Sequence, residues 1–156
     1  MNMKTPLLFF TLLIFSGLQA QTAQEEAIKH TIEYFFEGFH KRDTTHMQRV
    51  LYNRVHMQRI GKDPEGTPFL KDESIDGFLT SIATLPDTLQ IEERLHSYTI
   101  LNDGDMAQAW TPYSLYVQGE LHHCGVNSFQ LFHDGDSWKI IYIVDTRQVT
   151  ACEKSE

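Results

Sequence analysis

The feature that most constrains the fold is a series of strand-like segments that follows Pro86. Four of them succeed one another, at about residues 90–101, 105–118, 120–133 and 137–145. The sequences between them, "NDGD", "GE" and "HDGD", are typical of tight turns. Strands joined by tight turns pair with their chain neighbours, so this half of the chain predicts an antiparallel meander.

The region before Pro86 has helical periodicity instead. Apolar residues recur at helical spacing between residues 24 and 41, with glutamates early and "HK" last, which predicts an amphipathic helix. Asp43 predicts the N-cap of a second helix through about Leu51, and Ser74 begins a third. Two short strands, the first at about 55–60, are expected between them. The fold class is therefore α+β, with three helices packed on a curved antiparallel sheet.

The first 20 residues predict a secretory signal peptide. Lys4 precedes an apolar run that is too short for a membrane span, and "LQA" ends in a small residue. We expect cleavage between Ala20 and Gln21, which leaves one exported domain, residues 21–156, with no membrane span. The expected location is the periplasm or the exterior of the cell.

The charge of the mature chain argues against nucleic acid as a partner. Loss of Lys4 with the signal peptide changes the formal net charge from −8 to −9. No basic run remains that could neutralise phosphates.

The last two strands suggest a protein partner. The segments "VNSFQLF" and "WKIIYIV" are apolar at both parities, so both faces of the sheet require cover. Helices cover one face, and the other is covered either by a second copy of the chain or by the chain's own tail. A homodimer through the sheet is therefore expected.

Cys124 and Cys152 are the two cysteines of the chain, and an exported protein can join them. A turn near Gly135 would place Cys124 beside Asp145 or Thr146, within reach of the tail. A disulfide is the favoured reading, a buried unpaired thiol is the next, and a nucleophile beside a histidine is a third.

Two histidines precede Cys124, but a metal site is not expected. Side chains alternate between the faces of a strand, so His122 and His123 should point in opposite directions. A zinc site needs about four convergent ligands, and no CxxC or HxxxH spacing supplies them. No cofactor is predicted either.

Three stretches, "YFFEGFHKRD", "DGDMAQAW" and "HCGVNSFQLFHDGDSWKIIYIVDTR", resemble the nuclear-transport-factor-2-like superfamily, and within it a branch of exported bacterial proteins described as lumazine-binding. The resemblance implies a cone-shaped α+β fold with a cavity between the first helix and the concave sheet. It also implies a small ligand in that cavity and dimers through the sheet.

Several residues are candidates for that cavity. The predicted register places His123 near Thr146 or Arg147, with Asp145 close by, and a slip of one residue would separate their faces. Aromatic side chains could stack on a planar ligand such as a pterin, although such residues are more often core. The ligand-binding candidates are Tyr34, Trp110, Tyr113, His123, Asn127, Asp145 and Arg147.

Three functions stay open at this point. The first is a binding protein that holds a small, partly aromatic or heterocyclic molecule. The second is an isomerase- or dehydratase-type enzyme with His123 or Asp145 as the base and Tyr34 or Tyr113 as the proton donor. The third is a non-catalytic module whose apolar sheet face binds another exported protein.

Overall fold

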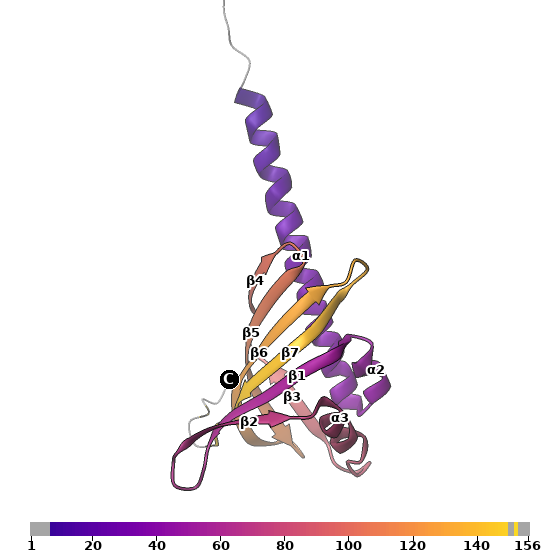
Figure 1. The fold of residues 1–156 in the computed structure, drawn as a ribbon, viewed down its shortest axis with the longest axis vertical. Helices are drawn as coiled ribbons and strands as arrows, with labels where there is room; N and C mark the ends of the chain where they lie inside the picture. The colour runs from indigo at the N-terminus through magenta and orange to yellow at the C-terminus, as the bar shows by residue number, and fades with distance from the viewer. Residues whose placement is uncertain (1–6, 150–151, 153–156) are drawn as a thin grey trace, which may run out of the picture.

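The structure, a computed structural model, describes residues 7–149 and 152, with side chains from residue 21 onward. It contains helices and strands in an order that agrees with the predicted α+β class (Figure 1). The elements are α1 Leu7–Lys41, α2 Thr44–Gln48, β1 Leu51–Lys62, β2 Pro68–Glu73, α3 Ile75–Ala83, β3 Ile91–Leu95, β4 Thr99–Asp103, β5 Met106–Val117, β6 Glu120–His133 and β7 Trp138–Thr146.

The strands form one seven-stranded sheet in the order β2-β1-β7-β6-β5-β3, and β4 also pairs with β5. The predicted antiparallel meander is present in β5, β6 and β7. The sheet as a whole is mixed, because β1 runs parallel to β7. This pairing brings the N-terminal strand next to the C-terminal one, so residues far apart in sequence share one surface.

Pro112 explains why the segment predicted as one strand, 90–101, is two strands. Proline has no backbone N–H, so it cannot donate a ladder bond to the chain opposite it. β3 pairs with β5 as far as Tyr113, and β4 resumes the pairing at Trp110. Between them, the N–H of His96 donates to the carbonyl of Pro112 at 2.9 Å.

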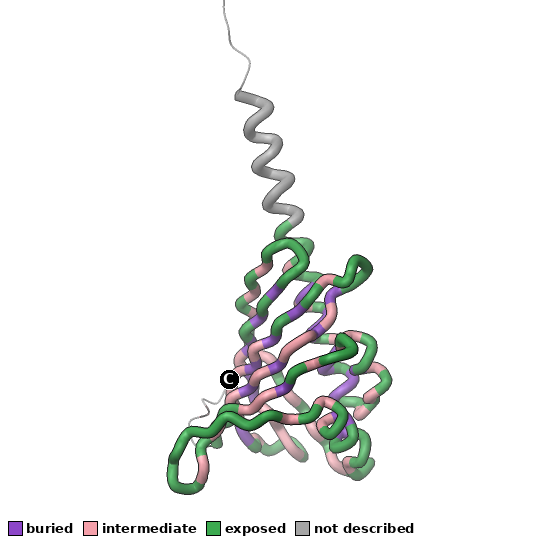
Figure 2. Tube along the Cα trace, viewed as in Figure 1, coloured by how far each residue is buried: buried purple, intermediate pink, exposed green. Residues whose placement is uncertain are grey.

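The helices cover one face of the curved sheet (Figure 1). The side chain of Asp43 accepts from the N–H of His46 and caps α2, and Ser74 caps α3 in the same way. α2 ends at Gln48, earlier than predicted, because β1 already begins at Leu51. Purple segments in Figure 2 mark buried positions on α1 and on the strands that it covers.

The buried core lies between α1 and the middle of the sheet. Its largest fully buried apolar side chains come from both layers: Ile28, Ile32, Met47, Phe129, Leu131 and Ile140. Burial of large apolar side chains is the main favourable term in folding. This packing fixes α1 against the sheet. Apart from Phe129, other residues form the lower part of the interface, beside α3 in Figure 1.

A disulfide joins Cys124 on β6 to Cys152, with the two Cα atoms 5.5 Å apart. The favoured reading of the cysteines is present in the structure. Gln148 pairs with Cys124 through two backbone hydrogen bonds of 3.0 and 2.8 Å, so the chain after β7 is held against β6. In the described part of the chain, no helix combines the length and apolar character that a membrane span requires.

Candidate functional site

A cavity of about 400 Å³ lies between the helices and the lower part of the sheet. We call it the inner cavity. Its apolar wall includes Phe35, Phe36 and Phe39 of α1 and Phe78 of α3. The rings of Phe39 and Phe78 are stacked with their centroids 6.3 Å apart. Its other wall is polar and comes from Arg59, Glu93, Tyr113, His122, His123, Asn127, Asp145 and Arg147. Of these, His122 and Arg147 are exposed, at the open side of the cavity.

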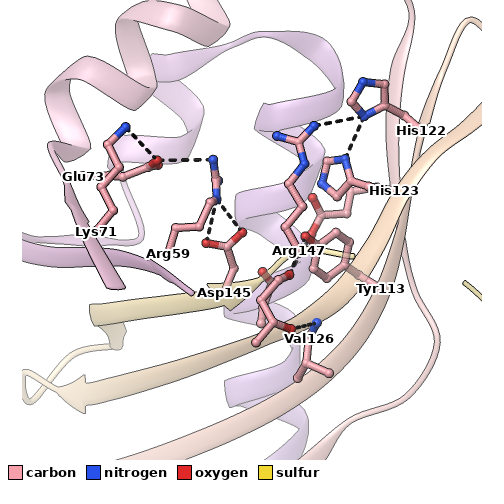
Figure 3. A network of polar contacts seen from close by, with 12 residues as sticks. Arg59, Lys71, Glu73, Tyr113, His122, His123, Val126, Asp145 and Arg147 are labelled. Carbon is pink, nitrogen blue, oxygen red and sulfur yellow. Dashed lines mark hydrogen bonds and ion pairs between the residues drawn. The ribbon is translucent and has the colours of Figure 1, made fainter. Parts of the chain in front are cut away.

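Asp145 and Arg59 form an ion pair at the base of the polar wall. They are neighbours in the register of β1 and β7, and Arg59 Nε lies 3.2 and 3.0 Å from the two carboxylate oxygens of Asp145. Arg59 also contacts Glu73 at 3.2 Å, and Glu73 contacts Lys71 at 3.8 Å. Figure 3 shows this chain of alternating charges. Arg59 is thereby paired with two carboxylates, those of Asp145 and Glu73.

Glu93 and Asn127 form a second pair in the same cavity. Asn127 Nδ2 donates to Glu93 Oε1 at 2.7 Å. The backbone N–H of Glu93 donates to His40 Nε2 at 2.9 Å, which ties β3 to α1. Burial raises the pKa of Glu93 to about 8, and the nearby charge of Asp145 adds to the effect. Glu93 is therefore mostly protonated near pH 7 and can donate a hydrogen bond.

Tyr113 crosses β6 to reach β7. Its hydroxyl donates to the carbonyl of Thr146 at 3.0 Å. A Cβ atom at Gly125 would lie 1.9 Å from that carbonyl oxygen and 3.0 Å from the Tyr113 ring. Glycine is therefore required at position 125 if the ring is to pass. Burial raises the pKa of Tyr113, so its hydroxyl stays protonated.

His122, His123 and Arg147 surround the mouth of the cavity. The Nδ1 atoms of the two histidines are 2.8 Å apart, and Arg147 donates to His122 Nδ1 at 3.3 Å (Figure 3). The expectation that the histidines point to opposite faces is wrong. Leu115 pairs with His123 and Tyr116 pairs with Leu121, so His122 is the extra residue of a β-bulge and strict alternation fails there.

The donors around the histidines fix their tautomers. Arginine stays protonated and can only donate, so His122 Nδ1 must be the acceptor. His123 Nδ1 must then carry the proton that it shares with His122, which leaves a lone pair on His123 Nε2. Burial, followed by the charge of Arg147, lowers the pKa of His123 to about 4, so this ring is neutral at physiological pH.

The chemical capacity of the polar wall follows from these states. It offers a protonated carboxyl at Glu93, a neutral imidazole at His123 and a carboxylate at Asp145 that Arg59 neutralises. Among the residues with described side chains, no group of three or more His, Cys, Asp and Glu is placed to hold a metal ion. The wall therefore suits hydrogen bonding and proton transfer.

Most of the predicted site residues meet in the inner cavity: Tyr113, His123, Asn127, Asp145 and Arg147 all line it. Tyr34 and Trp110 do not. Tyr34 stacks on His46 with the ring centroids 3.6 Å apart, outside the cavity. Trp110 is 47 % exposed and has outward parity on β5, because Ala109 and Thr111 take the inward positions.

The predicted register was displaced by two or three residues. Cys124 faces Gln148 and not Asp145 or Thr146, and Asp145 faces Asn127. One cause is a β-bulge at Ile141. Gln130 pairs with Tyr142 and Leu131 pairs with Ile140, so Ile141 has no partner on β6. His123 and Arg147 nevertheless line the same cavity.

Sequence reasoning missed two charged residues of the cavity. Neither Glu93 nor Arg59 is among the candidates named from the sequence. Both lie at the same parity as apolar residues: Glu93 between Ile91 and Leu95, and Arg59 after Met57. A charge on the apolar parity of a strand is the signal that identifies them.

No protein-family model matches the sequence, and no curated protein is similar to it at a significant level. Solved structures are similar in fold. An NTF2-like protein with a cystatin-like fold from Novosphingobium aromaticivorans has a TM-score of 0.68 at 12% identity, over 97% of this chain and 95% of that one. A cystatin-like protein of unknown function from Nostoc punctiforme has a TM-score of 0.63 at 11% identity, over 81% and 92% of the two chains.

A third similar structure is a proposed dehydratase of the NTF2-like family from Streptomyces avermitilis, with a TM-score of 0.60 at 13% identity over 83% of this chain and 99% of that one. Identities this low establish the fold alone. The resemblance drawn from the sequence is confirmed at that level, whereas the lumazine-binding branch is not shown. The chain has the NTF2-like, cystatin-like α+β fold.

Proposed function

We propose that the protein, once exported, binds a small, partly aromatic molecule in the inner cavity. One observation carries this proposal: a hollow of about 400 Å³ has aromatic side chains on one wall and ionisable groups on the other. Ligand sites in proteins are typically 300–1,000 Å³, mostly apolar, with a few polar groups that fix orientation. Polar residues turned inward also cost stability, which supports a use for them beyond the fold.

The binding function is tested with a cavity-filling variant. Leu115→Trp adds volume to the inner cavity, and Gln130→Trp adds the same ring on the outer face. We expect compounds from a library of aromatic heterocycles to raise the melting temperature of wild type and of Gln130→Trp but not of Leu115→Trp. A library that shifts none of the three proteins, or shifts all of them equally, contradicts the proposal.

Proton-transfer catalysis is a second candidate, and the protonated Glu93 is the observation that favours it. His123 Nε2 has a free lone pair and could remove a proton from a carbon next to a carbonyl group. Glu93 could donate to the carbonyl oxygen as negative charge develops. His123 keeps the role of base that the sequence predicted for it or for Asp145, whereas Glu93 takes the donor role predicted for Tyr34 or Tyr113. Asp145 and Tyr113 are already engaged by Arg59 and by the Thr146 carbonyl.

This catalysis is measurable before a substrate is known. Wild type should incorporate solvent deuterium next to the carbonyl of a cyclic ketone held in the cavity, and His123→Gln should not. The rate should fall above about pH 8, where Glu93 loses its proton. Equal incorporation by wild type and His123→Gln would leave binding as the only function.

We also propose a homodimer through the outer sheet face. Exposed apolar side chains gather there, and a shallow hollow of about 650 Å³ lies among them. Met106, Trp110, Phe132 and Tyr52 are between 38 % and 64 % exposed. Sedimentation should give a dimer for wild type and a monomer for Trp110→Glu. A monomeric wild type would instead favour a different protein partner for this face.

Export itself is proposed from the sequence. α1 begins at Leu7, and among those of its residues whose side chains are described, the first in the buried core is Ile28. Cleavage after Ala20 would therefore leave the helical part of that core intact. N-terminal sequencing of the protein from a periplasmic extract should begin at Gln21, and a chain that keeps Met1 would contradict export.

A further inference from the structure

Arg147 differs from the other arginine of the inner cavity. Arg59 contacts two carboxylates, at 3.0 Å and 3.2 Å. Arg147, in contrast, has no carboxylate within ion-pair distance among the residues whose side chains are described, and its guanidinium donates to the imidazole of His122. A guanidinium has five N–H donors in a planar fork. Among the residues with described side chains, most of the hydrogen-bonding capacity of Arg147 is therefore unused.

The position of Arg147 directs that capacity into the cavity. It follows β7 at the same parity as Ile143 and Asp145, and all three residues line the inner cavity. Its backbone N–H donates to the carbonyl of Ile60 at 3.3 Å, which fixes the strand end against β1. The contact with His122 turns the guanidinium across the mouth, beside His123 (Figure 3).

The charge of the remaining polar wall is close to balanced. Arg59 and Lys71 are offset by Asp145 and Glu73. Burial keeps Glu93 and His123 uncharged near neutral pH, since it raises the pKa of the acid and lowers that of the base. In the described part of the chain, one positive charge of this cavity is left without a carboxylate partner, that of Arg147 at the mouth, although the whole chain has a formal net charge of −8.

We propose that the ligand of the inner cavity is an aromatic monocarboxylate, and that the guanidinium of Arg147 binds its carboxylate group. One unpaired cation offsets one negative charge, and the planar guanidinium fork matches a planar carboxylate. The aromatic body of the ligand would extend from Arg147 toward Phe39 and Phe78. This inference rests on the proposed binding function and specifies the class of ligand.

The test uses matched pairs of probes: benzoate, 2-naphthoate and 2-anthracenecarboxylate, each with its uncharged primary amide. Calorimetry at pH 7 on the mature chain should give tighter binding of a carboxylate than of its amide. Arg147→Met should weaken carboxylate binding about 10- to 100-fold, the loss expected for a charge-assisted hydrogen bond, and leave amide binding unchanged. Arg147→Lys keeps the positive charge but loses the planar guanidinium fork. Its affinity for the carboxylate should therefore lie between those of wild type and Arg147→Met.

Arg94→Met is the matched control. Arg94 lies on the opposite face, where it is bonded to Glu92, and its replacement removes the same charge from the chain. It should leave the carboxylate preference unchanged. If amides and carboxylates bind wild type equally, or if Arg147→Met keeps the preference, the proposal is wrong while the binding function stands. If neither probe of any pair binds wild type, both proposals fail.

Discussion

The inward face of β5, β6 and β7 has two halves with opposite character. The upper half is packed solidly against α1, and its residues are at most 2 % exposed: Ala107, Ala109, Leu131 and Ile140. The lower half belongs to the same strands but surrounds the inner cavity with Tyr113, Leu115, His123, Asn127 and Asp145. We call these the packed half and the hollow half.

The difference separates what stabilises the protein from what it can do. The packed half removes apolar surface from water and places no charge there. The hollow half turns Asp145, Asn127 and His123 inward, and each is hydrogen-bonded there. A buried polar side chain without a hydrogen bond would lower the stability of the fold. Sites that depart from the rules of good packing are often functional ones.

The largest expected effect on stability comes from a matched pair of truncations, which tests whether the two halves are packed differently. Leu131→Ala, in the packed half, should lower the free energy of unfolding by about 3–5 kcal/mol, because a rigid core leaves a cavity behind. Leu115→Ala, in the hollow half, should lower it by about 1 kcal/mol, since its neighbourhood is already partly open. Urea unfolding of both variants measures the difference, and equal losses would mean that the two halves are packed alike.

The disulfide should give the next effect. Replacing Cys124 and Cys152 by alanine together should lower the free energy of unfolding by about 2–4 kcal/mol, because the bond closes a separation of 28 residues. The tail after β7 carries Arg147, so the hollow half should also lose carboxylate affinity in this variant. Unfolding of oxidised and reduced wild type gives an independent measure, and identical midpoints would show that the bond adds nothing.

Glu93 predicts a pH dependence. Its pKa is about 8 in the folded state and close to the reference value of 4.5 in the unfolded chain. Between these two pH values, the folded state holds a proton that the unfolded chain has lost. Stability is therefore lost as pH rises through this window, by up to about 1.4 kcal/mol per pH unit. His123 has the opposite slope between about pH 4 and its reference value of 6.5, because its folded pKa is lowered.

The two slopes oppose each other below pH 6.5, and Glu93 acts alone between there and pH 8. Glu93→Gln should abolish the decline in that upper range, so the variant becomes more stable than wild type at pH 8. Unfolding midpoints measured from pH 4 to pH 9 test this expectation. A wild type whose stability is flat between pH 6.5 and 8 would show that Glu93 titrates normally.

The smallest effect is expected from Tyr113→Phe. The variant removes the hydrogen bond to the Thr146 carbonyl but keeps the ring that lies over Gly125. A loss of about 1 kcal/mol follows from the net value of one hydrogen bond. Gly125→Ala should destabilise far more, since its Cβ would collide with the backbone. If both substitutions are tolerated equally, Tyr113 does not cross β6 as described.

Local patterns predicted the architecture but not the contents of the hollow half. Helical periodicity, turn sequences and the caps at Asp43 and Ser74 identified the elements because these signals act over a few residues. The bulges at His122 and Ile141 depend on how the whole sheet curves, so alternation alone misplaced His122.

The charged residues of the cavity were the other feature that the sequence did not predict. The sequence "IEERL" places Glu93 at the parity of Ile91 and Leu95, yet an acidic run ordinarily lies in solvent. The position of the Arg59 side chain was also not predictable from local sequence. Its partner Asp145 lies 86 residues away, and only the parallel pairing of β1 with β7 joins them. Tertiary pairing, and not local sequence, creates this site.

A crystal structure of the mature protein with a bound aromatic carboxylate tests the central claim most directly. We predict electron density for the ring beside Phe39 and Phe78, and for the carboxylate within hydrogen-bond distance of Arg147. A lower interface filled by side chains of α3, with Arg147 and His123 turned to bulk water, would contradict the account and leave only the fold.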